Sequence, residues 1–593
     1  MRQTSKQVAI SLVLDHDPVA HVAGFWIAEV EAVPQPQYVE GGLDDLWAIL
    51  ATNKVSRAYI QDLHFVSRFF IDYLCKKNAV EYHGRIDQFK GLYGYNVFEI
   101  HGSHVYNIEL YINAEGIYNK CTIFSCKDLT RSKLSEVQSD YNITLPTHLD
   151  GIRLHDYTVQ STSEDDIKLA EAQCFVSAAI TYIIRGNGCK KNTIGADAYN
   201  YWLKLDNPDA SWFPELGIEV DKYLREAYRG GLIYINPRYK NKELTQGICL
   251  DVNSLYSFVM RECPLPYGAA TYFEGLDVDA YLQDDPFEDD YFVGAFYVKA
   301  TLKNNHVPCI SLPSVTKTDA KIDALASGST NISNDYVADL DCQLTLTNFD
   351  ILNLYQNYNV EICYNIDGYQ FHTGSGMFNN FIDHFYESKR VSTGAKREVA
   401  KLHLEAFYGG FGLRPDASMV DYSIVDDKIE MKKSNKALVQ SKRIRYLPIS
   451  MFVTAIGRYL MLQNACEMLD RLVYIDTDGL HLLGTDVPDC IDISDQIGGF
   501  KVEAVFTRAK YCGYKIYIHD EARVYNKYSA NFSVDFDDVV TNVKIAGAPE
   551  KVQEKINWST FRSGYVVDTG NTTVKIIPGG AWRVDSSYTL PYF

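Results

Sequence analysis

The chain has 593 residues, too many for one compact hydrophobic core, so two to four domains are expected. Hydrophobic residues make up 46% and charged residues 22%, which is the composition of a folded protein rather than a disordered one. The net charge of −19 argues against a protein that coats nucleic acid, because such a protein should be basic. It leaves room for an enzyme whose basic residues are concentrated in one channel.

The cysteines and the apolar runs indicate in which compartment the protein is expected. The 13 cysteines are scattered and contain no CxxC pair, which indicates reduced thiols and argues against a zinc site. No apolar run has the length of a membrane helix, and the N-terminus lacks the long apolar core of a signal peptide. We therefore expect an intracellular protein with no membrane segment.

The predicted elements alternate between strands and helices along the chain. The first 190 residues mix strand-like runs such as VAISLVLDHD with helical ones such as DDIKLAEAQCFVSAAITYIIRG, and RGNGCKKNTIGAD marks the first domain boundary. Beyond residue 210 come a helix, the strand GICLDVNSLY, an acidic segment, and a Ser/Thr/Asn-rich stretch of exposed loops around 311–335. Helices are predicted over 394–412 and 451–470, and a small mixed module ends the chain. The coarse class is α+β in several domains.

The run RLVYIDTDGLHLLG (471–484) places two carboxylates, Asp476 and Asp478, at the centre of a buried-strand pattern. Ionised carboxylates there are costly unless they are paired, hydrogen-bonded or bound to metal. A hairpin turn through DTD would project both side chains at its tip. Asp251 follows a second apolar strand, GICL, and with Asp476 it would form the carboxylate pair of a two-metal phosphoryl-transfer site. Alone, either segment is more often a solvated loop or an imitation of a calcium site.

The segment GAKREVAKLHLEAFYGGFG (394–412) predicts a helix that ends at a Gly-rich break. Arg397, Lys401 and Tyr408 share one face of this helix. Two cations there suit a triphosphate, and the aromatic ring suits a base or sugar. The competing interpretation is a solvated ladder of Arg397, Lys401 and Glu405.

Taken in order, these segments resemble the three polymerase motifs of family B DNA polymerases: DVNSLY, then K-x-x-x-x-x-x-Y-G, then YIDTDG. AYRGG before the first motif, LPYG after it, and FTRAKYCGYKIYIHD further on resemble the protein-primed branch, which occurs in phages and plasmids with linear genomes and a terminal protein. VKIAG (543–547) and PGG (578–580) resemble the thumb of that branch. The likeness covers most of residues 210–593.

The resemblance implies a right-hand polymerase with palm, fingers and thumb behind an N-terminal ribonuclease-H-like exonuclease domain. The implied parts are the exonuclease-like domain (1–189), the palm (190–262 and 445–545), a terminal-protein region insert (263–375), the fingers (376–413), a second terminal-protein region insert for strand displacement (414–444) and the thumb (546–593).

The resemblance also implies roles for individual residues. The catalytic carboxylates would be Asp251, Asp476 and Asp478, and the ligands of Mg²⁺ (or Mn²⁺ as a substitute) would be Asp251, Val252 and Asp476. The nucleotide would be bound by Val252, Tyr256, Arg397, Lys401 and Tyr408, with Tyr256 excluding a 2′-hydroxyl, and DNA by Tyr228, Gly230, Gly231, Lys515 and Tyr517. The implied partners are template and primer DNA, dNTPs, a terminal protein and a single-strand-binding protein, in the cytoplasm of a bacterial host.

Two regions depart from the family pattern. In the fingers motif, Glu405 and Ala406 stand where Asn and Ser are usual, and Gly479 replaces the usual Ser after DTD. A carboxylate one turn from Lys401 is expected either to pair with it or to repel a triphosphate.

The exonuclease motifs are also altered. The first carboxylate pair is offered only by Asp15 and Asp17, and only with a gap, because an ungapped match gives Leu12 and Leu14. Val66 stands where the second motif needs an Asp, with Asp62 as the nearest substitute, and the third motif offers Asp166. Because a two-metal site loses most activity with one ligand, we predict an impaired nuclease on a retained fold.

Three hypotheses follow. The leading one is a protein-primed, DNA-directed DNA polymerase that replicates a linear viral or plasmid genome. The second is a polymerase with an altered task, such as primer-independent synthesis or nucleotidyl transfer to a protein. The third is a non-catalytic scaffold that keeps the polymerase fold, although nothing structural demands the combination of Asp251, Lys401, Asp476 and Asp478.

Overall fold

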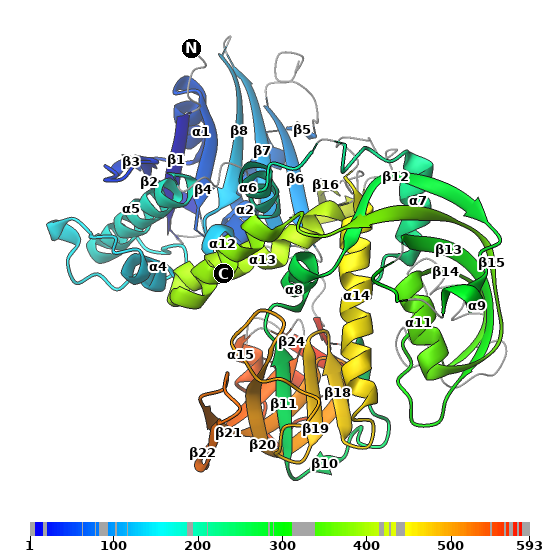
Figure 1. Cartoon of the computed structure of the whole chain (residues 1–593). Helices are drawn as coiled ribbons and strands as arrows, with labels where there is room; N and C mark the ends of the chain where they lie inside the picture. Colours follow the sequence, from blue (N-terminus) through cyan, green and yellow to red (C-terminus); the bar gives the residue numbers. More distant parts are fainter. Residues whose placement is uncertain are drawn as a thin grey trace.

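Three β-sheets organise the chain, and we call them the N-terminal, central and lateral sheets (Figure 1). Two small sheets, β16–β17 and β23–β25, accompany them. The computed structural model describes all residues except 1–5, 16–20, 62, 78, 82–92, 101–103, 115–116, 187–193, 210, 283–284, 289, 311–337, 414–419, 426–427, 434–444, 546–547, 549, 563–564, 569–572, 578–579 and 584–593.

The N-terminal sheet is mixed, with strand order β3-β2-β1-β4-β8-β7-β6-β5. Both faces of β1 are buried: Leu12 and Leu14 pack in the core formed with α1 and α2, whereas Ala9 and Val13 pack against the residues of α5. Helices on both faces are expected where strands pair in parallel, as β1 does with β4. The elements are β1 (Lys6–Asp15), β2 (His21–Glu29), β3 (Gln37–Glu40), α1 (Leu43–Thr52), β4 (Val55–Ile60), α2 (Leu63–Lys76), β5 (Val80–Glu81), β6 (Tyr93–Ile100), β7 (His104–Ala114), β8 (Ile117–Ser125), α3 (Lys127–Thr130), α4 (Leu134–Asp140) and α5 (Glu164–Gly186).

Helix α5 is the core helix of this part. Among the described residues it is the one helix with the length and hydropathy of a membrane span, over Glu164–Arg185. Yet 72% of that window is buried inside the protein, where it packs against β1 and β2. Its apolar character is therefore explained by tertiary packing.

The central sheet is antiparallel, with strand order β22-β21-β20-β11-β19-β18-β9 and β10 paired to β20. Strands β18 and β19 form the predicted hairpin, with Thr477 and Asp478 as its turn. β18 lies between β19 and β9, so its first four residues are buried, which explains the apolar run before Asp476. The strands are β9 (Ile233–Ile235), β10 (Glu243–Leu244), β11 (Gly247–Val252), β18 (Leu472–Asp476), β19 (Gly479–Leu483), β20 (Phe500–Gly513), β21 (Ile516–Tyr525) and β22 (Ser533–Ile545).

The lateral sheet, in the order β12-β15-β13-β14, lies on the opposite side of the long helix α14 from the central sheet (Figure 1). Helix α11 begins at a capping box, because Thr347 Oγ1 accepts from the Asp350 N–H at 3.1 Å and Asp350 accepts from the Thr347 N–H at 3.2 Å. The elements are β12 (Leu265–Glu274), α9 (Val278–Tyr281), β13 (Tyr291–Leu302), β14 (Asp339–Thr347), α11 (Asn348–Asn357) and β15 (Tyr358–Gly374).

Helices join the sheets through one continuous core, separate from the core under α1 and α2. Helix α13 confirms the helix predicted over 394–412, and its first turn is capped from the N-terminal part, since the Ala395 N–H donates to Asp140 of α4 at 2.5 Å. Helix α14 begins and ends earlier than the predicted 451–470, because Pro448 in its first turn favours initiation there. The helices are α6 (Ile194–Leu205), α7 (Ile218–Ala227), α8 (Leu255–Glu262), α12 (Asn379–Val391), α13 (Gly394–Phe411) and α14 (Leu447–Cys466).

The remaining elements are short. The β16–β17 hairpin (Val420–Val425 and Lys428–Lys433) is the described part of the predicted second insert, and the loops predicted around 311–335 lie largely outside the described residues. Near the C-terminal end stand α15 (Glu550–Gln553), β23 (Val566–Asp568), β24 (Thr573–Ile577) and β25 (Gly580–Arg583).

Candidate active site

Strand register brings Asp251 and Asp476 to the same level of the central sheet. Asp251 on β11 and Asp476 on β18 both lie directly opposite Gly479 of β19, the strand between them. Directly opposed residues of antiparallel strands project on the same face, so the two aspartates flank Gly479 with Cα atoms about 10 Å apart. Gly479 has no side chain, and the space above it therefore lies between the two carboxylates.

The hairpin turn places the third carboxylate beside this pair. Thr477 adopts a left-handed conformation with φ of 65°, and its N–H donates to the carbonyl of Leu232 at 2.7 Å. The carbonyl of Asp478 accepts from the N–H of Val252 at 2.9 Å, which ties the turn to the end of β11. Burial, and then the neighbouring charge of Asp251, raise the pKa of Asp478 to about 7.

Two lysines hold the aspartates. Lys501 of β20 forms an ion pair with Asp251, and Lys515 Nζ lies 3.0 Å from Asp476 Oδ1. The three carboxylates are not gathered within 4.8 Å of one another, since the one such group of His, Cys, Asp and Glu ligands among the described residues lies elsewhere. Convergence of the aspartates on one face is thus observed, whereas close contact between their oxygens is not.

The donors fit a hard divalent cation. Carboxylate and carbonyl oxygens are the ligands that Mg²⁺ prefers. Asp476 Oδ1 is buried and, within the described part of the chain, has no hydrogen-bond donor besides its ion pair with Lys515. Val252 is apolar and 4% exposed, so only its backbone carbonyl is a candidate ligand.

Above the turn, two tyrosines predicted to bind nucleotide lie in contact. The rings of Tyr256 on α8 and Tyr408 on α13 have centroids 4.6 Å apart. Gly231 lies against them: a Cβ there would stand 2.8 Å from the Tyr256 hydroxyl and 2.6 Å from Thr477 Cγ2. A side chain at position 231 would therefore displace either Tyr256 or the hairpin turn at Thr477.

The two predicted triphosphate ligands lie on α13 with carboxylates beside them. Lys401 Nζ lies 3.7 Å from Glu405 and 4.0 Å from Glu398, and the guanidinium of Arg397 lies 3.6 Å from Glu398. The pairing of Lys401 with Glu405 that the sequence raised is thus present in the fold. Both cations keep more than a third of their side-chain surface exposed, so they remain accessible to a ligand.

A further cation was not predicted from the sequence. Lys389, near the end of α12, donates from Nζ to Ser254 Oγ at 2.7 Å, at the residue that precedes α8. Burial, followed by the charges of Arg397, Lys501 and Lys401, lowers the pKa of Lys389 to about 8. In the sequence, Lys389 is one of several cations at a helix end, and only the packing of α12 on α8 distinguishes it.

The predicted DNA-binding loop, Tyr228 to Gly231, is fixed from behind by buried charges. Arg458 of α14 donates to the carbonyls of Arg229 and Gly230 at 3.1 and 2.9 Å and to Asp350 of α11 at 2.8 Å. Tyr228 packs with its hydroxyl against Gly412, where a Cβ would approach it to 2.9 Å. The loop is therefore held by α11, α13 and α14 together.

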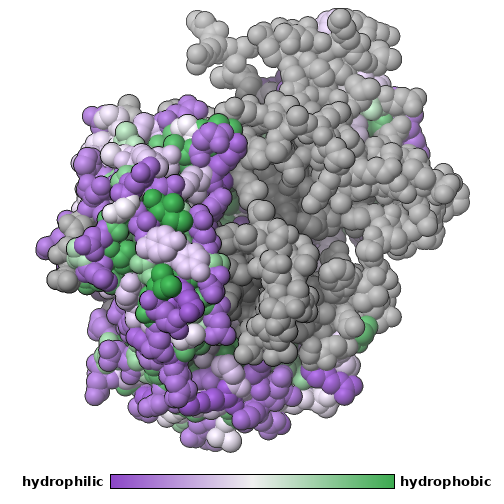
Figure 2. All heavy atoms as spheres, turned by 90° about the vertical axis from the view of Figure 1, so that its right-hand side faces the viewer, coloured by the Kyte–Doolittle hydropathy of each residue, from purple (hydrophilic) through white to green (hydrophobic). Residues whose placement is uncertain are grey.

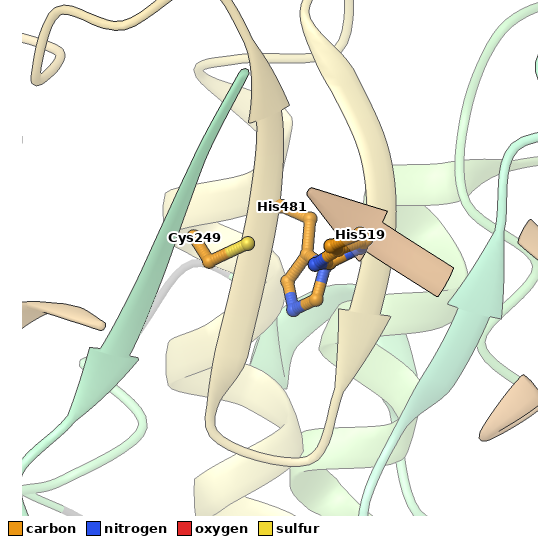
Figure 3. Close-up of side chains that lie close together, drawn as sticks. All are labelled: Cys249, His481 and His519. Atoms are coloured by element: carbon orange, nitrogen blue, oxygen red, sulfur yellow. The ribbon is translucent and has the colours of Figure 1, made fainter. Parts of the chain in front are cut away.

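Lys515 and Tyr517 stand over a layer of aromatic and histidine side chains on the same face of the central sheet as Asp251 and Asp476. Lys515 donates its N–H to the Tyr474 hydroxyl at 2.8 Å, and the ring of Tyr517 stacks on His519 at 4.5 Å. Beneath it, Cys249, His481 and His519 come from three different strands and offer ligand atoms within 4.8 Å of one another (Figure 3).

The two histidines of this trio are joined by hydrogen bonds through Tyr511. The hydroxyl of Tyr511 lies 2.7 Å from His481 Nδ1 and 2.8 Å from His519 Nε2, and His519 Nδ1 faces Glu521 at 3.3 Å. Burial lowers the pKa of both imidazoles and raises that of the Cys249 thiol, so all three groups are neutral near pH 7. We interpret the layer as a hydrogen-bonded network that covers β18 and β19 on this face of the sheet.

The exonuclease candidates are not assembled in the described residues. Asp15 lies at the end of β1 opposite His21, and Asp166 accepts from the Ser163 hydroxyl at 2.6 Å in the first turn of α5. Asp17 and Asp62 lie outside the described residues. No three described carboxylates of this part lie within 4.8 Å of one another.

The positions where the family pattern expects ligands are apolar in this chain. Leu12, Leu14 and Val66 are at most 1% exposed and share the core under α1 and α2. The ungapped match therefore describes core residues.

Comparison with solved structures identifies the class to which this fold belongs. The Bacillus phage phi29 DNA polymerase, in its complex with primer-template DNA and incoming nucleotide, superposes with a TM-score of 0.81 over 99% of this chain and 100% of that one, at 24% sequence identity. Its complex with single-stranded DNA gives a TM-score of 0.77. The fold is thus that of a right-hand polymerase with an N-terminal exonuclease-type domain, as predicted.

The sequence comparisons place the chain within that class. The model for type B DNA polymerases, organellar and viral, matches residues 166–497, more than half of the chain. The chain belongs to this family. The DNA polymerase of Bacillus phage B103 is 33% identical over 388 residues and that of Streptococcus phage Cp-1 is 28% identical over 391 residues. These matches cover 64% of this chain and span 64% and 62% of the length of the two relatives.

Proposed function

We propose that this protein is a DNA-directed DNA polymerase that replicates a linear viral genome from a protein primer. The observation that carries the proposal is the placement of Asp251 and Asp476 on either side of Gly479, with Arg397 and Lys401 of α13 close enough to act on Lys389, as Lys501 at Asp251 also does. The family membership and the fold of phi29 DNA polymerase support it.

The residues divide the work of nucleotidyl transfer between a carboxylate side and a cationic side. The primer 3′-hydroxyl, or a terminal-protein hydroxyl at initiation, attacks the α-phosphate in line, and pyrophosphate leaves. Mg²⁺, with Mn²⁺ as a substitute, is the cation that Asp251, Asp476 and the Val252 carbonyl suit, and when bound it acidifies the attacking hydroxyl and neutralises charge on the phosphate. Asp478 completes the anionic side.

The cationic side binds and orients the nucleotide. Arg397, Lys401 and Lys389 hold the triphosphate, and the contact of Tyr256 with Tyr408 forms a surface for the sugar and the new base pair. Because Gly231 closes in on the Tyr256 hydroxyl, Tyr256 has little room to yield, and we propose that it rejects a 2′-hydroxyl.

The partners follow from the same proposal. Template and primer DNA and dNTPs are bound by the related phi29 polymerase in its solved complexes, and we assign them to this chain. Tyr228, Gly230 and Gly231 would contact the template, and Lys515 and Tyr517 the primer. A terminal protein and a single-strand-binding protein are further proposed partners, in the cytoplasm of a bacterial host.

The Asp476→Ala variant tests the polymerase. We expect primer extension with Mg²⁺ to fall by about a thousandfold or more, because a two-metal site loses most of its activity with one ligand. Asp538→Ala, which removes a surface carboxylate of β22 paired to Arg523, is the matched control and should retain activity.

The alternatives give different results in the same assay. Equal absence of incorporation in wild type and Asp476→Ala, with both proteins folded by circular dichroism, would favour the non-catalytic scaffold. Incorporation by the wild type without primer or terminal protein would favour the altered task.

We further propose that the N-terminal domain is an impaired 3′→5′ exonuclease. The core positions of Leu12, Leu14 and Val66 support this, because they offer no ligand where the family expects carboxylates. We expect a 5′-labelled single strand to be degraded no faster by wild type than by Asp15→Ala. Degradation that Asp15→Ala abolishes would contradict the proposal.

A further inference from the structure

Lys501 is placed on a catalytic carboxylate by strand register. It lies directly opposite Asp251 in the antiparallel pairing of β20 with β11, so the two side chains share one face of the sheet. Its ammonium forms an ion pair with Asp251 Oδ2, and each side chain is only 17% exposed. Strand register thus keeps the two residues opposite each other, while their side chains remain free to separate.

The charge on Lys501 is stabilised where it lies. The ion pair with Asp251 compensates the burial of the Lys501 ammonium. Glu503 stands two residues along β20, at the irregularity in the pairing of β20 with β11, and lies close enough to Lys501 for that charge to oppose the rise in pKa that burial causes in Glu503. The ammonium of Lys501 is therefore paired with Asp251 and lies near a second carboxylate, that of Glu503.

The surroundings make a further cation at Asp251 unfavourable. Lys515 pairs with Asp476 at 3.0 Å, and Lys389 lies close enough for the charge of Lys501 to lower its pKa. Lys515 keeps 45% of its side chain exposed and has solvent available to it, whereas Lys501 is enclosed. For a divalent cation to bind Asp251 Oδ2, Lys501 has to move.

We propose that the ammonium of Lys501 competes with the divalent cation for Asp251. When the cation binds, the ammonium moves from Asp251 to Glu503. This rests on the proposed function, because it concerns the same site. It has a consequence for the order of events: the free protein binds divalent cations weakly, and a triphosphate strengthens the binding. The phosphate oxygens offer new acceptors to the lysines and new ligands to the cation.

Binding of Mn²⁺ to the full-length protein, without DNA or nucleotide, tests the competition. The free ion is counted by electron paramagnetic resonance in titrations of wild type, Lys501→Met, Lys501→Arg and Lys510→Met. We expect Lys501→Met to bind Mn²⁺ about tenfold more tightly or better, because a competing charge is removed at contact distance. Lys501→Arg keeps the charge and should resemble wild type.

Lys510→Met is the matched control, since Lys510 lies on the same strand, is also half-buried, and its loss changes the net charge equally. It should leave the Mn²⁺ affinity within about twofold of wild type, because it acts only through the screened long-range field. Equal tightening in Lys501→Met and Lys510→Met would overturn the proposal in favour of a general charge effect.

Thermal unfolding separates competition from a structural role. Lys501→Met leaves the carboxylate of Asp251 unpaired, so its melting temperature in EDTA should fall, and Mn²⁺ should raise it more than it raises that of wild type. A lower melting temperature with unchanged Mn²⁺ affinity would overturn the proposal and leave Lys501 a structural residue. Failure of the proposed function looks different: Mn²⁺ binding by Lys501→Met would be absent, or would be unaffected when Asp476→Ala is added.

Discussion

At the scale of single residues, Glu405 bears on the role in nucleotide binding that we propose for Lys401. The family pattern has Asn at this position, and this chain places a carboxylate 3.7 Å from Lys401 Nζ instead. Both side chains are about half exposed, so the pair is weak, of the order of 0.2–1 kcal/mol. In the proposed function this energy reduces the affinity for a triphosphate, because the ammonium of Lys401 has to leave Glu405 to bind phosphate.

We therefore predict that Glu405→Gln lowers the KM for dNTPs by about two- to fivefold with little change in kcat. The variant removes a competing anion and leaves the shape of the side chain almost unchanged. Single-nucleotide incorporation kinetics measure the effect, and Glu387→Gln, which frees Arg390 on α12, is the control. A KM that rises in Glu405→Gln would show that Glu405 supports nucleotide binding.

At the scale of elements, α12 and α13 form the pair that presents the cations, and a buried histidine joins them. The ring of His403 on α13 stacks on Phe385 of α12, with centroids 4.5 Å apart and planes at 6°. His403 is 2% exposed, and burial lowers its pKa to about 4. The folded protein therefore keeps this imidazole neutral in a pH range where the unfolded chain protonates it.

The sign of the pH effect follows from these two pKa values. Above pH 6.5 the group is neutral in both states and contributes nothing to pH dependence. Between pH 6.5 and about 4 the unfolded state binds the extra proton, so the wild type loses stability as the pH falls.

We predict that the difference in unfolding free energy between wild type and His403→Phe shifts against wild type by about 1.4 kcal/mol per pH unit in this window. Phe retains the stacked ring but binds no proton. Urea unfolding followed by circular dichroism at several pH values measures the difference. His372→Gln, at a side chain 69% exposed, should show no such trend. A pH-independent difference for His403→Phe would contradict the assignment.

At the scale of the whole molecule, the chain is strongly acidic, whereas a group of cations lies around the carboxylates of the central sheet. There are 76 acidic and 57 basic residues in the chain, and on the coloured part of the face drawn in Figure 2 hydrophilic residues surround small groups of apolar ones. The cations Lys389, Arg397, Lys401, Lys501 and Lys515 meet instead around the carboxylates of the central sheet. The DNA binding that we propose therefore depends on a focused set of cations, which act against an unfavourable overall field.

We predict that binding of primer-template DNA weakens by about tenfold or more between about 50 mM and about 200 mM salt. Binding weakens because the counterions released from the phosphates return to a more concentrated salt solution. The same salt screens the longer-range repulsion between DNA and the acidic exterior, which by itself would strengthen binding. Fluorescence anisotropy with a labelled duplex measures the affinity. Binding that is independent of salt would contradict a focused cationic channel.

The sequence by itself determined individual elements of the fold and the family, although each motif taken alone is weak. The apolar run ending at Asp476 and the helix predicted over 394–412 follow from periodicity and turn chemistry, which depend on neighbours a few residues away. These features predicted the hairpin and the helix, which the structure confirms, and the resemblance of the ordered motifs predicted the family, which the comparisons confirm.

Tertiary structure decided what the charges do. Lys501 meets Asp251 across 250 positions of sequence, and Lys389 reaches Ser254 across 135. Strand register and helix packing make those contacts, and both are set by the burial of apolar surface far from the charged groups themselves. The sequence could therefore name the carboxylates of the site, but only the folded sheet could show which cations hold them.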